Sequence, residues 1–79
     1  MWLTVADIIE LQLRSEHITL DALLKASGIV GSGGEAKVLI SAGGVLVNGE
    51  IELRRGRKLR AGDEVVAAGR RVRVRVGAA

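Results

Sequence analysis

The chain has 79 residues, which is enough for one hydrophobic core and too few for two. It contains no cysteine and a single histidine, His17, so a disulfide framework, a thiolate metal site and the common zinc geometries are excluded. The formal charge of +3 is unevenly divided, because residues 1–52 include three basic and seven acidic residues, whereas residues 53–79 include nine basic and two acidic ones, a net charge of +7.

The N-terminal third is expected to form a strand and then a short helix. Alternating apolar and polar residues favour a strand from about Ile8 to Arg14, although apolar residues at helical spacing in the same segment leave a helix as the alternative. Thr19 is a suitable N-cap for a helix whose leucines, at the i, i+3 and i+4 positions, form one apolar face. Gly28 can adopt the left-handed conformation that ends such a helix.

A second helix is predicted from about Gly33 to Ala42. Ser32 and Glu35 have the S-x-x-E spacing of a capping box, in which each side chain bonds a free backbone amide near the start of the helix. Gly43-Gly44 follows and ends the helix. Lys37 is expected on the flank of the buried face. That face should consist of Ala36, Leu39 and Ile40.

The period of the apolar residues changes from 3.6 to 2 after the second helix, which predicts strands. The strand Val45 to Val47 leads into Asn48-Gly49, a strong signal for a hairpin whose turn requires positive φ. Further strands are predicted around Arg57 to Arg60 and Glu64 to Ala68, with a turn at Ala61 to Asp63 between them.

The last predicted strand alternates between valine and arginine without exception. One face should carry Val72, Val74 and Val76, and the other Arg71, Arg73 and Arg75. Because helices come first and strands last, we expect a single α+β domain, residues 1–79, in which two helices cover one face of a small sheet.

Several short motifs occur in an order that resembles one family. They are Thr19-Leu20, Leu23-Leu24-Lys25, Gly28, Ser32 to Lys37, Leu39-Ile40, Gly44-Val45, Val47-Asn48-Gly49, Arg54 to Leu59 and Gly62-Asp63. This series resembles the RNA-binding domain named after small-subunit ribosomal protein S4, also called the alpha-L motif, and it is most similar to small bacterial proteins that consist of little else. The resemblance covers about residues 8–76, and the combined pattern is specific although each piece alone is weak.

The resemblance implies two short helices packed on a small, mostly antiparallel sheet of four to five strands, with structured RNA held by the second helix and the loops and strands beside it. The positions that match the motif and are candidates for RNA contact are Ser32, Lys37, Asn48, Arg54, Arg55, Arg57 and Lys58. Gly33 is a departure, because many relatives have arginine after the serine that opens the second helix.

The basic run Arg54-Arg55-Gly56-Arg57-Lys58, with Arg60 two residues further on, is the main candidate site. Arginine binds phosphate through a planar fork of donors, so clustered arginines can follow a sugar-phosphate backbone. A charged edge that prevents strand aggregation is the alternative explanation, but it does not require so large an excess of positive charge.

Three other features have a structural explanation beside a functional one. The glycines of Ser32-Gly33-Gly34 would let a phosphate approach the amides of the helix start, near Lys37, but an ordinary capping box explains them equally well. Asn48 is more readily explained as a turn residue than as an RNA contact. The arginines of the last strand either contact RNA or form the wet face of an edge strand.

The aromatic content indicates the mode of recognition. Phe and Tyr are absent, and the single aromatic residue, Trp2, is expected to anchor the N-terminal segment, so the basic half of the chain has no platform for stacking bases. We therefore expect binding to the phosphates, 2′-hydroxyls and shape of a structured RNA, such as ribosomal RNA or an assembly intermediate.

The alternative function is a protein-interaction adaptor whose basic stripe docks on an acidic partner protein. Neither function involves catalysis, because His17 has no carboxylate partner at a suitable spacing and no acidic pair is spaced for acid/base chemistry. No cofactor, metal or small-molecule substrate is expected. No apolar run reaches the roughly 18 residues of a membrane span and no signal peptide is recognisable, so we expect a cytoplasmic monomer that does not bind membranes.

Overall fold

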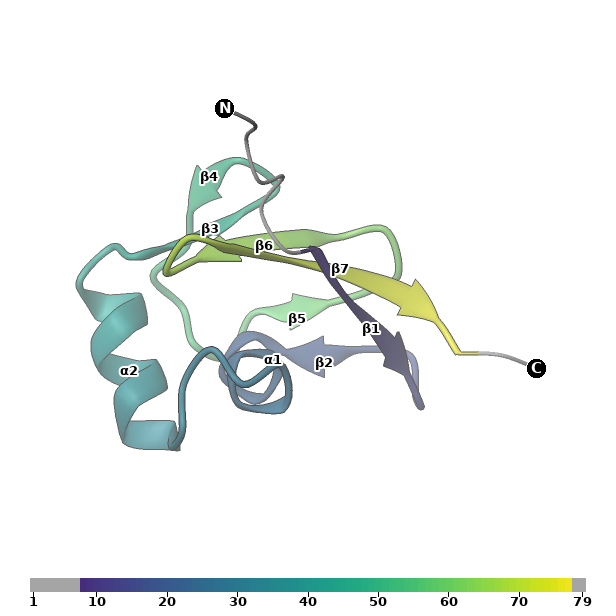
Figure 1. Ribbon diagram of the computed structural model, residues 1–79, viewed down its shortest axis with the longest axis horizontal. Coiled ribbons are helices and arrows are strands. Elements are labelled where there is room, and N and C mark those ends of the chain that lie inside the picture. The colour runs from purple at the N-terminus through teal and green to yellow at the C-terminus, as the bar shows by residue number, and fades with distance from the viewer. Residues whose placement is uncertain (1–7, 78–79) are drawn as a thin grey trace, which may run out of the picture.

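The computed structural model describes residues 8–77, which form two helices and seven strands (Figure 1). The elements in chain order are β1 (Ile8–Leu13), β2 (Ile18–Thr19), α1 (Leu20–Ala26), α2 (Gly33–Ser41), β3 (Val45–Val47), β4 (Glu50–Ile51), β5 (Lys58–Leu59), β6 (Glu64–Ala67) and β7 (Arg70–Val76). The expected role of Trp2 as an N-terminal anchor lies outside the described residues.

The strands form a five-stranded sheet in the order β1-β7-β6-β3-β4 and a separate two-stranded ribbon of β2 and β5. Every neighbouring pair is antiparallel except β1 and β7, which run parallel with Ile9 opposite Val72 and Leu11 opposite Val74. The predicted α+β class, with two helices on a mostly antiparallel sheet, is confirmed. The predicted strand around Arg57 to Arg60 is shorter and pairs with β2, a strand that the sequence did not indicate.

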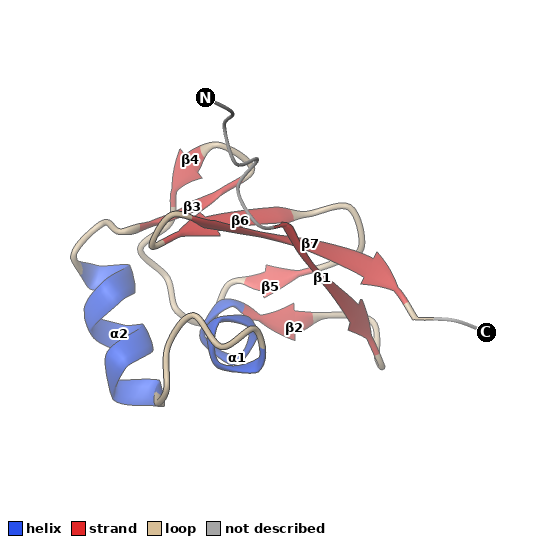
Figure 2. Ribbon diagram, in the orientation of Figure 1, coloured by secondary structure: helices blue, strands red, loops and turns tan. Residues whose placement is uncertain are grey.

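Both helices and the β2–β5 ribbon lie on the same side of the five-stranded sheet (Figure 2). The space between these layers is filled by aliphatic side chains, because the sheet and the helices each need a partner for their apolar faces. The fully buried core residues with the largest side chains are Leu20, Leu23 and Leu24 of α1, Ile40 of α2, Leu59 of β5, and Val45, Val65, Val72 and Val74 of the sheet.

The helix ends follow the predicted chemistry with one difference. Gly28 has a φ of +81° after α1, as expected of a residue that ends a helix in the left-handed conformation. At the start of α2, the Ser32 hydroxyl accepts a hydrogen bond from the Glu35 amide at 3.2 Å. The Glu35 carboxylate accepts from the amide of Gly31 at 2.6 Å, one residue before the serine that an ordinary capping box would bond.

The burial of α2 agrees with the predicted face at two positions. Ala36 and Ile40 are buried, whereas Leu39 is only partly buried and packs against the margin of the core. Lys37 is exposed, and the helix ends at Ser41, one residue earlier than predicted.

Val76, at the end of β7, is 73% exposed and lies outside the core. Val72 and Val74 are buried as expected. Ladder pairing between β6 and β7 ends at Arg73, and the backbone of Val74 still bonds Gly62 and Asp63, so only the last two residues of β7 have β1 as their sole backbone partner. Alternation therefore predicted the face on which Val76 lies but could not show that the core ends before it.

Two hairpins of the sheet have tight turns with two residues at positive φ. The predicted turn at Asn48 and Gly49 has φ values of 52° and 86° and joins β3 to β4. The turn between β6 and β7 has the same character, with φ of 52° at Ala68 and 75° at Gly69. Asparagine tolerates this conformation, whereas alanine does not favour it.

Replacing Ala68 with asparagine is therefore expected to stabilise the domain. Holding an ordinary L-residue in the left-handed region costs about 1–2 kcal/mol, and asparagine should recover about 0.5–1 kcal/mol of it. For a domain of this size the melting temperature should rise by about 2–8 °C. Thermal unfolding followed by circular dichroism measures the change, with Ala61→Asn as a control in a turn where φ is not positive. If the melting temperature of Ala68→Asn is no higher than that of the control, the backbone at Ala68 is not strained.

Candidate nucleic-acid interface

Residues 52–58, here called the basic loop, connect β4 to β5 and are docked on the start of α1. The amide of Leu20 donates to the Arg57 carbonyl at 2.9 Å, and the amide of Asp21 donates to the Arg55 carbonyl at 3.0 Å. The first amides of a helix have no acceptor within the helix. The basic loop supplies acceptors for two of these amides, whereas the Thr19 side chain makes no capping hydrogen bond.

Both ends of the basic loop are also fixed to neighbouring strands. At its start, the Glu52 amide donates to the Val45 carbonyl at 3.0 Å. At its end, Lys58 pairs with Thr19 across the β2–β5 ribbon. Leu59 follows directly and is fully buried in the core. The backbone that carries the arginines is therefore held at its two ends and in its middle.

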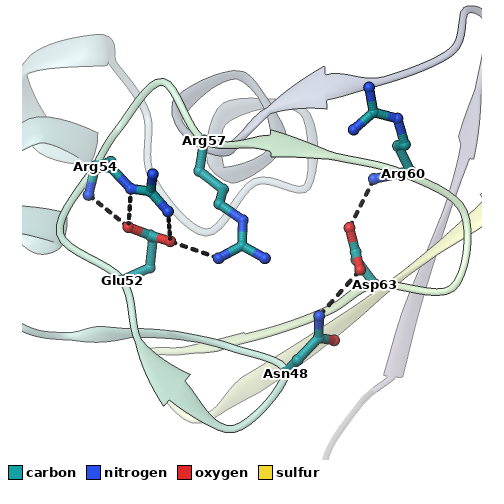
Figure 3. Close-up of polar contacts among 6 residues, drawn as sticks. All are labelled: Asn48, Glu52, Arg54, Arg57, Arg60 and Asp63. Carbon is teal, nitrogen blue, oxygen red and sulfur yellow. Dashed lines mark hydrogen bonds and ion pairs between the residues drawn. The ribbon is translucent and has the colours of Figure 1, made fainter.

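The Glu52 carboxylate lies at the centre of the basic loop and binds two of its arginines (Figure 3). It accepts from the Arg54 backbone amide at 3.0 Å, from Arg54 Nε at 3.0 Å and Nη2 at 3.3 Å, and from Arg57 Nη1 at 2.8 Å. Glu52 is only 6% exposed and is the one buried charged residue within 8–77. Sequence reasoning missed it, although a lone carboxylate beside a basic run was a visible signal.

Hydrogen bonds from Arg54, and then from Arg57, lower the pKa of Glu52 to about 2. Because this pKa lies below the usual glutamate value of 4.5, ionised Glu52 stabilises the fold above pH 4.5 and loses this contribution only as the pH falls towards about 2. The carboxylate is consequently charged, and binds its two arginines, at any pH near neutrality.

The remaining cations of the predicted site have no such partner. Arg55, Lys58 and Arg60 are exposed, and no ion pair involving them is found within residues 8–77. In Figure 3 the guanidinium groups of Arg54 and Arg57 point towards Glu52, whereas that of Arg60 points away from it. The basic loop thus combines two arginines of fixed position with cations that are free to turn towards a ligand.

Asn48 has a structural role, since its side chain connects the β3–β4 turn to the turn before β6. Its Nδ2 donates to Asp63 Oδ1 at 3.0 Å, and its Oδ1 accepts from the Glu64 amide at 2.9 Å. The other oxygen of Asp63 accepts from the Arg60 amide at 2.8 Å. Asn48 therefore helps to position Arg60, and any contact of its own with RNA stays a prediction.

The start of α2 is exposed but carries negative charge. Ser32, Gly33 and Gly34 are accessible to a ligand, as is Lys37. The Glu35 carboxylate, however, lies on the Gly31 amide. A phosphate approaching this helix end would meet that charge, so the arrangement favours capping over anion binding.

Three arginines of β7, those of the alternating row, are paired with carboxylates of neighbouring strands. Arg71 and Arg73 lie 3.6 and 3.1 Å from Glu64, and Arg75 lies 2.8 Å from Glu10. The three arginines thus form cross-strand ion pairs on the face of the sheet that the helices do not cover.

In the part of the chain that the structure describes, no helix is long and apolar enough to cross a membrane. Residues 8–77 contain no group of three or more His, Cys, Asp or Glu side chains placed to hold a metal ion.

The fold and the basic loop define a small α+β domain with two helices, in which the start of α1 holds an arginine-rich loop in place. The family model described as the S4 domain matches residues 11–75, and the chain belongs to this family. The predicted resemblance is therefore confirmed.

Named relatives agree with the family assignment. The chain is 46% identical over 59 residues to RlbA of Bacillus subtilis (strain 168), named as a probable ribosome maturation protein; the match covers 75% of this chain and 83% of RlbA. It is 43% identical over 58 residues to YbcJ of Escherichia coli (strain K12), named as a putative RNA-binding protein; the match covers 73% of this chain and 83% of YbcJ.

A solved structure is similar over nearly the whole chain. The solution structure of E. coli YbcJ, described as having an alpha-L motif involved in RNA binding, superimposes with a TM-score of 0.67 at 35% sequence identity. The similarity covers 96% of this chain and 98% of YbcJ. The alpha-L fold predicted from the sequence is confirmed by this likeness.

Proposed function

We propose that this protein binds structured RNA through the basic loop and Arg60. The observation that carries the proposal is the rigid backbone of an arginine-rich loop from which Arg55, Lys58 and Arg60 extend into solvent. Membership of the S4 domain family and the names of its relatives support the same ligand class. Ser32, Gly33, Gly34 and Lys37 on α2, and Asn48, are secondary candidates for contact.

The proposed mode of recognition is contact with phosphates and 2′-hydroxyls in a folded RNA. Residues 8–77 contain no Phe, Tyr or Trp, and their one imidazole, that of His17, lies outside the basic loop, so this loop has no aromatic ring on which the bases of a single strand could stack. Ribosomal RNA or an assembly intermediate is the proposed target, and the name of RlbA supports it. We further propose that residues 1–79 act as one cytoplasmic, monomeric binding unit without catalytic activity.

The salt dependence of binding tests this proposal. Affinity for an RNA stem-loop should fall with a log–log slope of about −3 to −4 if four or five phosphates are neutralised. An unstructured RNA of equal length should bind more weakly because it cannot present the same spacing of phosphates. Fluorescence anisotropy at several salt concentrations measures both, and equal affinity for the two RNAs at every concentration would contradict recognition of structure.

The second candidate function is an adaptor that docks on an acidic protein. Gly33, at a position where many relatives have arginine, and the Glu35 carboxylate at the start of α2 favour it, because both weaken this helix as a phosphate site. Pull-down from lysate with and without ribonuclease separates the two functions. Partners that persist after RNA is destroyed would support the adaptor, whereas partners that disappear would support RNA binding.

A further inference from the structure

We infer that Glu52 is a positioning residue of the RNA-binding surface, which holds Arg54 and Arg57 so that their remaining N–H groups form a fixed set of donors for a phosphodiester. The inference rests on the proposed function and deepens it by assigning an acidic residue to a basic site. Glu52 itself would not touch RNA, since a carboxylate repels phosphate. It would act through the two guanidinium groups that it binds.

The geometry of Arg54 shows how one side chain can bind both Glu52 and a ligand. A guanidinium has five N–H donors. Arg54 uses Nε and one N–H of Nη2 for the carboxylate, which leaves both hydrogens of Nη1 and the second hydrogen of Nη2. The free Nη1 and Nη2 hydrogens at the far end of the group form the parallel pair that binds phosphate bidentately. Arg54 is 74% exposed, so this edge is accessible.

Arg57 is held in a complementary way. It donates a single bond from Nη1 to Glu52 Oε1, the oxygen that also accepts from Arg54 Nη2, and is 34% exposed, so most of its donors remain available while its position is restricted. Both guanidinium groups are consequently attached to one carboxylate, which fixes their separation. Glu52 is fixed in turn by its burial and by the hydrogen bond that its backbone amide donates to the Val45 carbonyl.

The energetic benefit of this arrangement is preorganisation. A free arginine side chain has several rotatable bonds, and immobilising it on a ligand costs conformational entropy. Glu52 orders two such side chains before RNA arrives. The contribution of its negative charge opposes binding, so positioning and simple charge counting predict opposite signs for its removal.

The substitution Glu52→Gln tests the inference, with Glu50→Gln as the matched control. Both remove one negative charge from the same hairpin, but no ion pair or side-chain hydrogen bond of Glu50 is found within residues 8–77. Glu50→Gln is expected to bind a stem-loop RNA as well as the wild type or somewhat more tightly. Glu52→Gln is expected to bind the stem-loop RNA about tenfold more weakly than the wild type, although its net positive charge is greater by one. Equal or tighter binding by Glu52→Gln than by Glu50→Gln would overturn the inference.

A double-mutant cycle separates positioning from a general structural role. In the background Arg54→Ala and Arg57→Ala, Glu52→Gln also removes a buried charge without partners, so affinities are compared at a temperature at which every variant is folded. Glu52→Gln and Glu50→Gln should then have the same effect on RNA affinity, because no guanidinium remains to be positioned. A tenfold loss that persists in this background would show that Glu52 acts through the fold and would overturn the inference. Circular dichroism confirms that each variant is folded at the assay temperature.

If Glu52→Gln does not fold, Glu52→Asp tests the positioning role of Glu52 instead. Aspartate keeps the charge but withdraws the carboxylate by one methylene, so affinity should fall while the net charge is unchanged; unaltered affinity would overturn the inference. The proposed function itself would be contradicted by another result, namely that the wild-type protein shows no preference for structured RNA over unstructured RNA.

Discussion

Replacing Arg54, Arg55, Arg57 and Lys58 together with alanine is expected to weaken binding to structured RNA by at least about a hundredfold at moderate salt. These four residues are all of the basic residues in the basic loop, and each neutralised phosphate adds about 0.7–0.9 to the magnitude of the salt slope. The slope should therefore flatten from about −3 to −4 to about −1 or less. Anisotropy titrations of wild type and variant over the same salt range measure both quantities.

In that experiment a loss of affinity could come from lost RNA contacts or from a destabilised fold, and a double substitution distinguishes the two. Arg54 and Arg57 also neutralise the buried Glu52, so their loss leaves a buried charge without partners and destabilises the fold. Arg55 and Lys58 are exposed and were found in no ion pair within residues 8–77, so the double variant Arg55→Ala and Lys58→Ala should stay folded. Its slope should fall in magnitude by about two.

The matched control removes two positive charges from the sheet instead. Arg71 and Arg75 are paired with Glu64 and Glu10, so replacing both with alanine should change RNA affinity far less than the change in the basic loop. If the two double variants lose the same affinity, binding depends on total charge and the basic loop is not the site. This comparison also answers whether the arginine row of β7 contacts RNA.

Leu59→Ala is expected to remove most of the stability of the domain and to leave a large fraction of the molecules unfolded at room temperature. Leu59 is 0% exposed and packs in the single core, where truncating a leucine to alanine costs about 2–5 kcal/mol. A domain of this size has about 3–5 kcal/mol of net stability. Because the same residue anchors the end of the basic loop, RNA binding should be lost together with the fold. Urea unfolding followed by circular dichroism measures the free energy of unfolding.

Leu53→Ala provides the comparison for this substitution. Leu53 lies in the basic loop but is 61% exposed, so its truncation should change the free energy of unfolding by less than about 0.5 kcal/mol. Similar stabilities for Leu59→Ala and Leu53→Ala would show that Leu59 is not an anchor of the core.

The elements that could be predicted from the sequence are those whose chemistry is local. The apolar face of α1, the serine cap of α2 and the left-handed Gly28 each depend on residues within a few positions of one another. The Asn48-Gly49 turn is local in the same sense, because positive φ is a property of the two residues themselves. The basic run was also visible directly, since charge density requires no knowledge of the fold.

The sequence by itself determined the composition of the core, the positions of the helices and hairpins, and the segment that carries the positive charge. Only the tertiary structure decided that β1 pairs in parallel with β7, that β5 leaves the sheet to pair with β2, and that Glu52 holds Arg54 and Arg57. The physical reason is that a local pattern shows which face of a segment is apolar but not which distant segment will cover it. Val76 was placed on the correct face and is nevertheless exposed, because no neighbouring layer reaches it.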